Sequence, residues 1–166
     1  MKTQVVQNQF LEGVAALLQE GRTVRVRIGG RSMDPFIRGG MDEVELVPYE
    51  PECDLPLWTC VFFRWGESYV VHRYIGREGH LFCFMGDGNL LQVEKVEETL
   101  VLGVLRTIYH PDGTEQDCFS SRWLCKGELW YRLRRFRRFL LPFYRRFMGV
   151  NVRNFRKRFV YLYFKN

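Results

Sequence analysis

The sequence has no long apolar run, no secretory signal and no even set of cysteines, and each absence excludes a class of protein. The longest apolar stretches span a few residues, whereas a helix that crosses a bilayer needs about 20. The opening residues MKTQVVQNQFLEG lack both a basic start and an apolar core, so we expect no secretory signal and no export. The five cysteines are then expected to be reduced thiols. Two pairs have the spacing C-x6-C, but zinc sites use tighter pairs, so we expect no metal site and no cofactor.

The chain does have the composition of one packed domain with a short appendage. Of its 166 residues, 46% are hydrophobic and 27% are charged. The charge is divided unevenly along the chain. Residues 1–121 hold 11 Lys and Arg against 18 acidic residues, a net charge of −7, and residues 122–166 hold 14 against one, a net charge of +13. Such a basic tail on an acidic body indicates an interaction with an anionic surface.

Hydrophobic periodicity predicts a helix followed by a mostly β domain. Apolar residues recur at helical spacing over residues 7–19, and Gly21 follows as a stop. Short segments rich in β-branched and aromatic residues predict strands over residues 23–28, 42–47, 60–64, 68–75, 81–85 and 100–109. We therefore expect an N-terminal helix (1–21), a compact β domain (22–121) and a basic amphipathic helical tail (122–166).

The tail repeats large apolar residues in steps of three and four from Leu129 to Phe147, with arginines between them. Pro142 is expected to kink this helix. The pattern is typical of a helix that lies in the plane of an anionic membrane surface, and we expect a cytoplasmic protein held peripherally at the inner face. A helix docked on its own domain would show the same pattern. Basic residues among aromatics also suit single-stranded nucleic acid, but no nucleic-acid motif accompanies them, so we do not expect that partner.

Three short motifs hold residue types that hydrolytic chemistry uses. Ser32 follows Gly30 directly after a predicted strand, where a glycine turn exposes both the hydroxyl and a backbone N–H. His72 lies in an apolar strand, where a histidine needs a polar partner. Asp87 stands in a glycine turn, two residues before Asn89. Taken singly, each is better explained as a turn serine, a core histidine with a polar partner or a turn aspartate.

Their order along the chain resembles that of the S24/S26 peptidase superfamily, which contains type I signal peptidases and self-cleaving repressor peptidases. Ser32-Met33-Asp34-Pro35 resembles the family's nucleophile box Ser-Met-x-Pro. Residues 70–75 (VVHRYI) resemble the base-bearing strand of the signal peptidases that use histidine, and residues 84–89 (FMGDGN) resemble the following Gly-Asp-x-Asn box. The resemblance spans roughly residues 24–106 and implies the family's partly open β-barrel fold.

The resemblance also implies a role for each matching residue. Ser32 would attack the substrate carbonyl, and its backbone N–H would help to bind the oxyanion. His72 would accept the serine proton and return it to the leaving amine. Asp87 would orient His72 or hold the site together, and Glu94 is the other acid that follows the last box. The turn and the substrate floor would be shaped by Gly30, Met33, Pro35 and Asn89.

These residues predict a serine endopeptidase with a Ser32–His72 dyad. Its substrate would be an extended peptide: a leader, a signal-like segment or a propeptide. Two alternatives stay open at this point. The chain is otherwise a catalytically impaired relative that binds peptides or proteins, or a protein whose basic tail does the main work at a membrane surface or on nucleic acid.

Overall fold

Alternating apolar and polar residues form the first two strands of the sheet. The computed structural model describes residues 2–147 and 162–163, and side chains over residues 9–147. In β1 (Val24–Arg27) and β2 (Glu43–Pro48) every second side chain is buried. The two strands pair antiparallel with Val24 opposite Leu46. Arg25 and Arg27 on the outer face both bind Glu43, at N···O distances of 2.9 and 2.7 Å.

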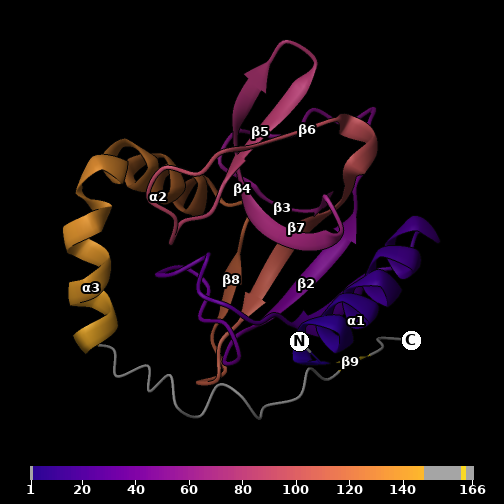
Figure 1. Ribbon diagram of the computed structural model, residues 1–166, viewed down its shortest axis with the longest axis horizontal. Helices are drawn as coiled ribbons and strands as arrows, with labels where there is room; N and C mark the ends of the chain where they lie inside the picture. Colours follow the sequence, from indigo (N-terminus) through magenta and orange to yellow (C-terminus); the bar gives the residue numbers. More distant parts are fainter. Residues whose placement is uncertain (1, 148–161, 164–166) are drawn as a thin grey trace.

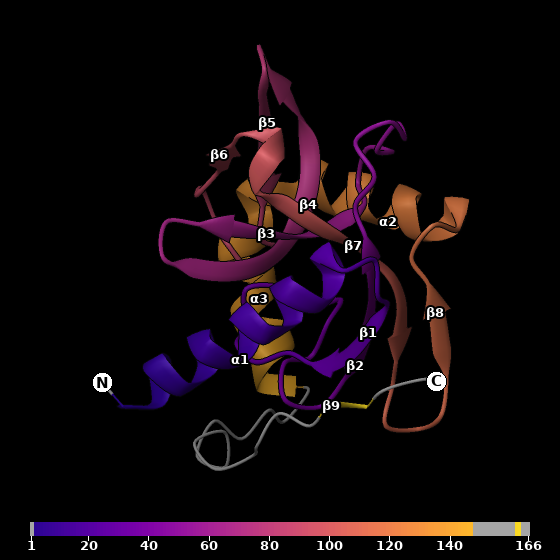
Figure 2. The ribbon, with the colours of Figure 1, turned by 90° about the vertical axis from the view of Figure 1, so that its right-hand side faces the viewer.

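The described strands form one antiparallel sheet that curls into a half-barrel (Figures 1 and 2). Its order is β6-β5-β4-β3-β7-β2-β1-β9, and β8 pairs with β7 outside this path. This arrangement, with helices before and after it, confirms the predicted mostly β architecture. The further elements are β3 (Cys60–Trp65), β4 (Ser68–Glu78), β5 (Leu81–Met85), β6 (Glu94–Val96), the 3-10 turn η1 (Glu98–Leu100), β7 (Val101–Tyr109), β8 (Glu115–Asp117) and β9 (Leu162–Tyr163).

Both faces of the central strands are buried, which explains their nearly continuous apolar sequence. On one face Phe62 joins the larger of two hydrophobic clusters, and on the other face Phe63 joins the smaller cluster. β3 and β4 pair so that Val61 lies opposite His72. Directly opposed residues of an antiparallel pair point to the same face, so His72 shares the face of Val61 and Phe63. Its neighbour Arg73 points to the other face.

Helices cover the half-barrel on opposite sides (Figures 1 and 2). α1 (Lys2–Gln19) packs Val14, Ala15 and Leu18 into the larger cluster. On the other side lie α2 (Ser121–Arg132), the 3-10 turn η2 (Leu133–Phe136) and α3 (Arg137–Phe147). The sequence pattern predicted one helix from Leu129 onward, but the structure breaks it at η2 and keeps Pro142 inside α3. No helix in the described ranges is both long and apolar enough to cross a membrane.

Candidate active site

Ser32 lies on a tight turn directly after β1. Hydrogen bonds from the backbone N–H of Phe36 and of Ile37 to the Met33 carbonyl oxygen close this turn, at N···O distances of 3.0 Å each. Gly30 has a φ of +89°, a conformation that glycine adopts without strain. The Met33 side chain is buried and anchors the turn, while Ser32 is half-buried. Among the described residues, none accepts a hydrogen bond from the Ser32 backbone N–H.

The Ser32 turn interlocks with the Gly86–Asn89 turn, 54 residues further along the chain. The Gly88 N–H donates to the Ser32 carbonyl oxygen at 2.7 Å. A Cβ atom at Gly86 would lie 2.6 Å from the same oxygen, and one at Gly88 would collide with the Arg31 carbonyl oxygen. Only glycine allows two backbones to approach this closely. The structure thus brings together two of the three predicted motifs and gives each glycine a steric reason.

His72 is buried on β4, and its ring lies on the face of the smaller hydrophobic cluster, whereas Met33 of the Ser32 turn belongs to the larger cluster. The strand register pairs Arg73 with Met85, so the next step places Gly86 across from His72. The His72 ring meets the Phe63 ring edge-on, and its Nδ1 lies 3.0 Å from the Glu94 Oε2. The other ring nitrogen, Nε2, has no hydrogen-bond partner within the described residues, and neither has the second Glu94 oxygen. A buried ring nitrogen without a partner costs free energy, which is typical of functional sites.

Asp87 does not contact His72 but forms a buried ion pair with Arg73. The carboxylate accepts bonds from the Arg73 Nε at 2.9 Å and from the Nη2 at 2.6 Å. The Arg73 Nη1 donates to the Trp58 carbonyl oxygen at 2.6 Å. Burial alone would lower the pKa of Arg73, but the Asp87 charge and hydrogen bonds raise it overall. Of the two carboxylates considered for His72, Glu94 contacts the ring in the structure, and Asp87 pairs with Arg73 instead.

The basic tail donates hydrogen bonds to the Gly86–Asn89 turn. The sequence patterns predicted no role for the tail in the site. The Trp130 Nε1 of α2 donates to the Asp87 carbonyl oxygen at 2.8 Å. The Arg137 Nη1 of α3 donates to the carbonyl oxygens of Gly86 and Asn89, at 3.0 and 3.1 Å. Burial lowers the pKa of the Arg137 guanidinium, and the Asp87 charge opposes that shift. Docking of the tail on its own domain, one of the two main alternatives, is thus observed for this part of it.

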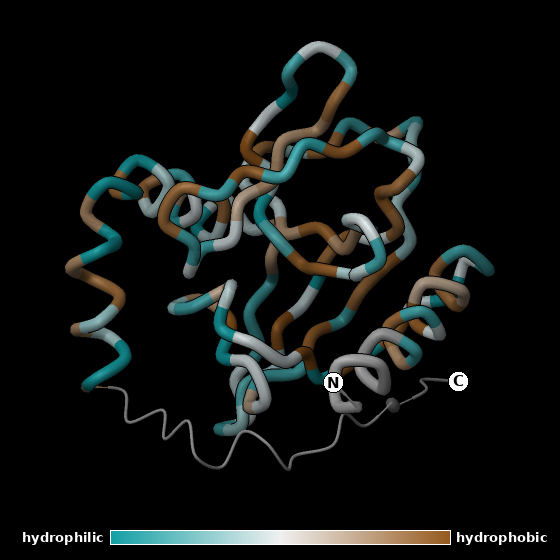
Figure 3. Tube along the Cα trace, viewed as in Figure 1, coloured by the Kyte–Doolittle hydropathy of each residue, from teal (hydrophilic) through white to brown (hydrophobic). Residues whose placement is uncertain are grey.

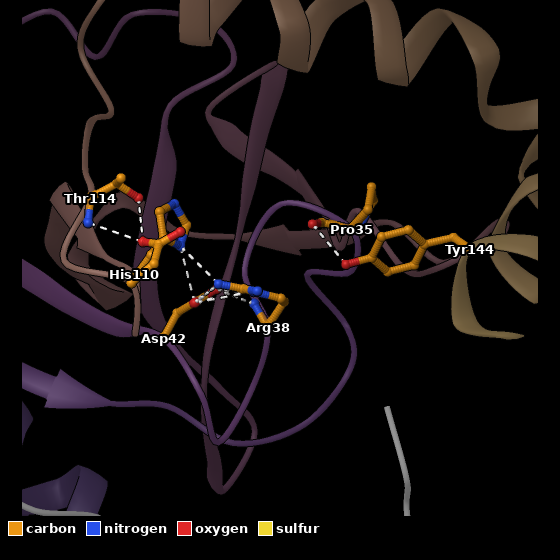
Figure 4. A network of polar contacts seen from close by, with 7 residues as sticks. Pro35, Arg38, Asp42, His110, Thr114 and Tyr144 are labelled. Carbon is orange, nitrogen blue, oxygen red and sulfur yellow. Dashed lines mark hydrogen bonds and ion pairs between the residues drawn. The ribbon is translucent and has the colours of Figure 1, made fainter. Parts of the chain in front are cut away.

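The far end of α3 holds the Ser32 turn in the same way. The Arg145 Nε lies 3.1 Å from the Asp34 Oδ2, and Asp34 is buried. The Tyr144 hydroxyl donates to the Pro35 carbonyl oxygen at 3.3 Å and points from α3 toward the turn (Figure 4). Tyr144 and Arg145 lie seven and eight residues after Arg137 on the same helix, so α3 contacts both turns. The sequence signal that could have predicted these contacts was the helical spacing of Arg137, Leu141, Tyr144 and Arg145, which places them on one side of a helix.

A hollow of about 170 Å³ opens beside Ser32. Met33 forms part of its wall, as the expected substrate floor would, whereas Pro35 and Asn89 are not among its lining residues. Asn89 instead lies against Gly86, with its side-chain nitrogen 2.8 Å from the position of a Gly86 Cβ. Most of the lining is apolar, and α1, β3 and β4 supply Phe10, Leu11, Phe62, Tyr69, Val70 and Val71. Arg27 of β1 is the charged residue among those that line the hollow.

A second histidine network lies outside this site. The buried carboxylate of Asp42 binds the His110 Nδ1 at 3.0 Å and the Arg38 Nη2 at 2.8 Å (Figure 4). The network ties the segment that follows the Ser32 turn to the end of β7, because Glu43 and Tyr109 are paired next to it.

The chain matches no model of a known protein family, and no curated protein or solved structure matches it.

Proposed function

We propose that this chain is a serine endopeptidase of the S24/S26 type, in which Ser32, His72 and Glu94 act as nucleophile, base and orienting acid. The observation that supports the proposal is the contact between the Ser32 turn and the Gly86–Asn89 turn, which directly follows the strand paired with that of His72. The Ser32 turn is bonded to the Gly86–Asn89 turn, Gly86 lies across from His72, and His72 is held by Glu94 with its second nitrogen unpartnered. We further propose that the curled sheet is the partly open β-barrel of that superfamily.

The proposed reaction uses three groups: the Ser32 hydroxyl, the Ser32 backbone N–H and the His72 Nε2. The Ser32 Oγ attacks the carbonyl carbon of the scissile peptide bond while its proton passes to the His72 Nε2. The oxyanion is stabilised by the Ser32 backbone N–H. His72 then gives its proton to the departing amine nitrogen, and the C–N bond breaks to leave an ester on Ser32. Water, deprotonated in turn by His72, hydrolyses this ester and restores the hydroxyl.

Glu94 keeps the imidazole in the tautomer that this cycle requires. Because the Glu94 Oε2 accepts from the Nδ1–H, the lone pair of neutral His72 is on Nε2. The negative charge of Glu94 also stabilises the imidazolium that forms during attack. Ser32 and His72 are not hydrogen-bonded to each other within the described residues, and such catalytic bonds often tighten only when substrate binds.

The hollow beside Ser32 supports a preference for substrates with an apolar side chain near the scissile bond. A cavity of about 170 Å³ lined largely by aromatic and aliphatic side chains, with Arg27 in its wall, disfavours a lysine or arginine, because burial of an unpaired charge is costly. Burial of an apolar side chain in it would instead gain roughly 1.5–3 kcal/mol. A leader or propeptide with such a residue is the proposed substrate.

A fluorophosphonate probe tests the proposal, because it forms a covalent bond only with an activated serine. We expect labelling of Ser32, shown by peptide mass spectrometry, and its complete loss in Ser32→Ala. His72→Gln and Glu94→Gln should slow labelling by about 10³–10⁴-fold while circular dichroism shows a retained fold. Ser68→Ala, a half-buried serine on the same strand as His72, is the matched control and should label normally.

Two outcomes would contradict the mechanism. Labelling that persists at full rate in His72→Gln would show that the histidine is not the base. Absence of any labelling across neutral pH would instead favour a peptide-binding module that lacks catalytic activity.

A further inference from the structure

α3 has two faces of opposite character. Its inner face holds the site through Arg137 and Arg145, with Leu141 buried between them. Its outer face, together with Phe136 at the end of η2, exposes large apolar side chains that nothing in the described part of the chain covers. Their exposed fractions are high for such residues: Phe136 58%, Phe139 62%, Leu140 40%, Phe143 65% and Phe147 70%.

The spacing of these five residues places them along one side of the helix, in steps of three, one, three and four. Figure 1 shows α3 at the periphery of the molecule, on the side away from α1, and Figure 3 shows hydrophobic positions alternating with hydrophilic ones along it. These five exposed side chains therefore lie on the outer side of a peripheral helix, and together they are called the ridge. A contiguous apolar ridge on a surface helix marks an interaction site.

The charge around the ridge identifies its partner. Residues 129–147 contain seven arginines and no acidic residue, and residues 148–166 add five basic residues and again no acid. Arg135, Arg138 and Arg146 are exposed, and the Arg138 guanidinium lies 4.5 Å from the centre of the Phe139 ring. A helix with phenylalanine and leucine on one face and arginine beside them matches the boundary between acyl chains and anionic headgroups.

We infer that α3 docks this protein on an anionic membrane surface, with the ridge of Phe136, Phe139, Leu140, Phe143 and Phe147 inserted among the acyl chains. Arg138 and Arg146 then lie at the depth of the phosphate groups. The inner face of the same helix grips the Ser32 turn through Asp34 and the Gly86–Asn89 turn through Arg137. Docking therefore fixes the orientation of the site relative to the membrane. The inference stands on the helix alone and does not rest on peptidase activity.

Flotation of the full chain with lipid vesicles tests the inference. We expect it to float with vesicles of equimolar phosphatidylcholine and phosphatidylglycerol, and less with phosphatidylcholine alone. The double substitution Phe139→Ser/Phe143→Ser should lower the partition coefficient roughly tenfold or more, because the apolar contribution is lost. Arg138→Gln/Arg146→Gln should lower it about fivefold per arginine and weaken its salt dependence.

Two controls separate the ridge from general stickiness and from catalysis. Trp65→Ser removes an exposed apolar side chain (45% exposed) at the turn between β3 and β4, so its flotation should be unchanged. Ser32→Ala should also float like the parent chain, which keeps this test independent of the proposed function. Both ridge substitutions are on the surface, so thermal unfolding should show a retained fold.

Three results would overturn the inference. Equal flotation of the parent chain and the Phe139→Ser/Phe143→Ser variant would show that the ridge does not enter lipid. Tighter binding to a single-stranded oligonucleotide than to anionic vesicles would assign the surface to nucleic acid. A dimer in analytical ultracentrifugation that becomes monomeric in the same variant, without any vesicle binding, would show that a second copy covers the ridge.

Discussion

The buried ion pair between Asp87 and Arg73 gives the sharpest test of how the site is held together. Both side chains are about 1% exposed, and the carboxylate receives two bonds shorter than 3.0 Å from the guanidinium. Asp87→Asn keeps the size of the side chain but removes its charge. The positive charge of Arg73 then remains buried, faced by the neutral amide and by the Trp58 carbonyl oxygen.

The cost of this change can be estimated. Two unit charges about 4 Å apart attract each other by about 4 kcal/mol at the effective dielectric constant near 20 that reproduces measured protein electrostatics. Removal of one partner of a buried pair typically costs about 3–5 kcal/mol. We therefore expect Asp87→Asn to lower the free energy of unfolding by about 3–5 kcal/mol. For a chain of this length that corresponds to a fall in Tm of about 6–20 °C.

Urea unfolding followed by tryptophan fluorescence measures this loss. Glu78→Gln is the control, because Glu78 pairs with Lys95 at the exposed edge of the sheet and should have little effect. The double variant Arg73→Met/Asp87→Asn should recover a large part of the loss, since no buried charge is then left unpaired. The buried-charge reasoning would be refuted if Asp87→Asn were as stable as the control. It would also be refuted if the double variant lost as much free energy of unfolding as Asp87→Asn and the single variant Arg73→Met together.

Two further predictions concern the junction of the turns and the thiols. Gly88→Ala should reduce fluorophosphonate labelling at least tenfold, because the new methyl group collides with the Arg31 carbonyl oxygen and breaks the bond to Ser32; Gly13→Ala, in open space on α1, should leave labelling unchanged, and equal labelling of both variants would contradict the interlocked turns. Titration with a thiol reagent should modify two cysteines in the native protein and three more only after unfolding, since burial raises the pKa of Cys60 to about 12; rapid modification of a third cysteine would contradict this. The exposed pair is Cys53 and Cys125, and the buried set is Cys60, Cys83 and Cys118.

Hydrophobic periodicity predicted those strands and helices that are long enough for the period to show. The alternation over residues 23–28 became β1, and that over residues 42–47 became β2, with the expected sides buried. β6, β8 and β9 are only two or three residues long, too short for any period to appear. The break at η2 was also hidden, because its residues continue the helical spacing of the tail and Pro142 was the more obvious candidate for an interruption.

For the site, the sequence by itself determined which residue types stand in each motif: the serine turn, the histidine strand and the glycine turn. Partner choice was decided only by the tertiary structure. The motif order favoured Asp87 over Glu94 as the partner of His72, but β4 turns consecutive side chains to opposite faces, so that Arg73 meets Asp87 and His72 meets Glu94. The apolar spacing of the tail likewise could not distinguish a docked helix from an open one. In the folded chain Arg137 and Arg145 point inward, because buried backbone carbonyl oxygens and the Asp34 carboxylate, which Arg31 also contacts, accept hydrogen bonds there, and the phenylalanines point outward.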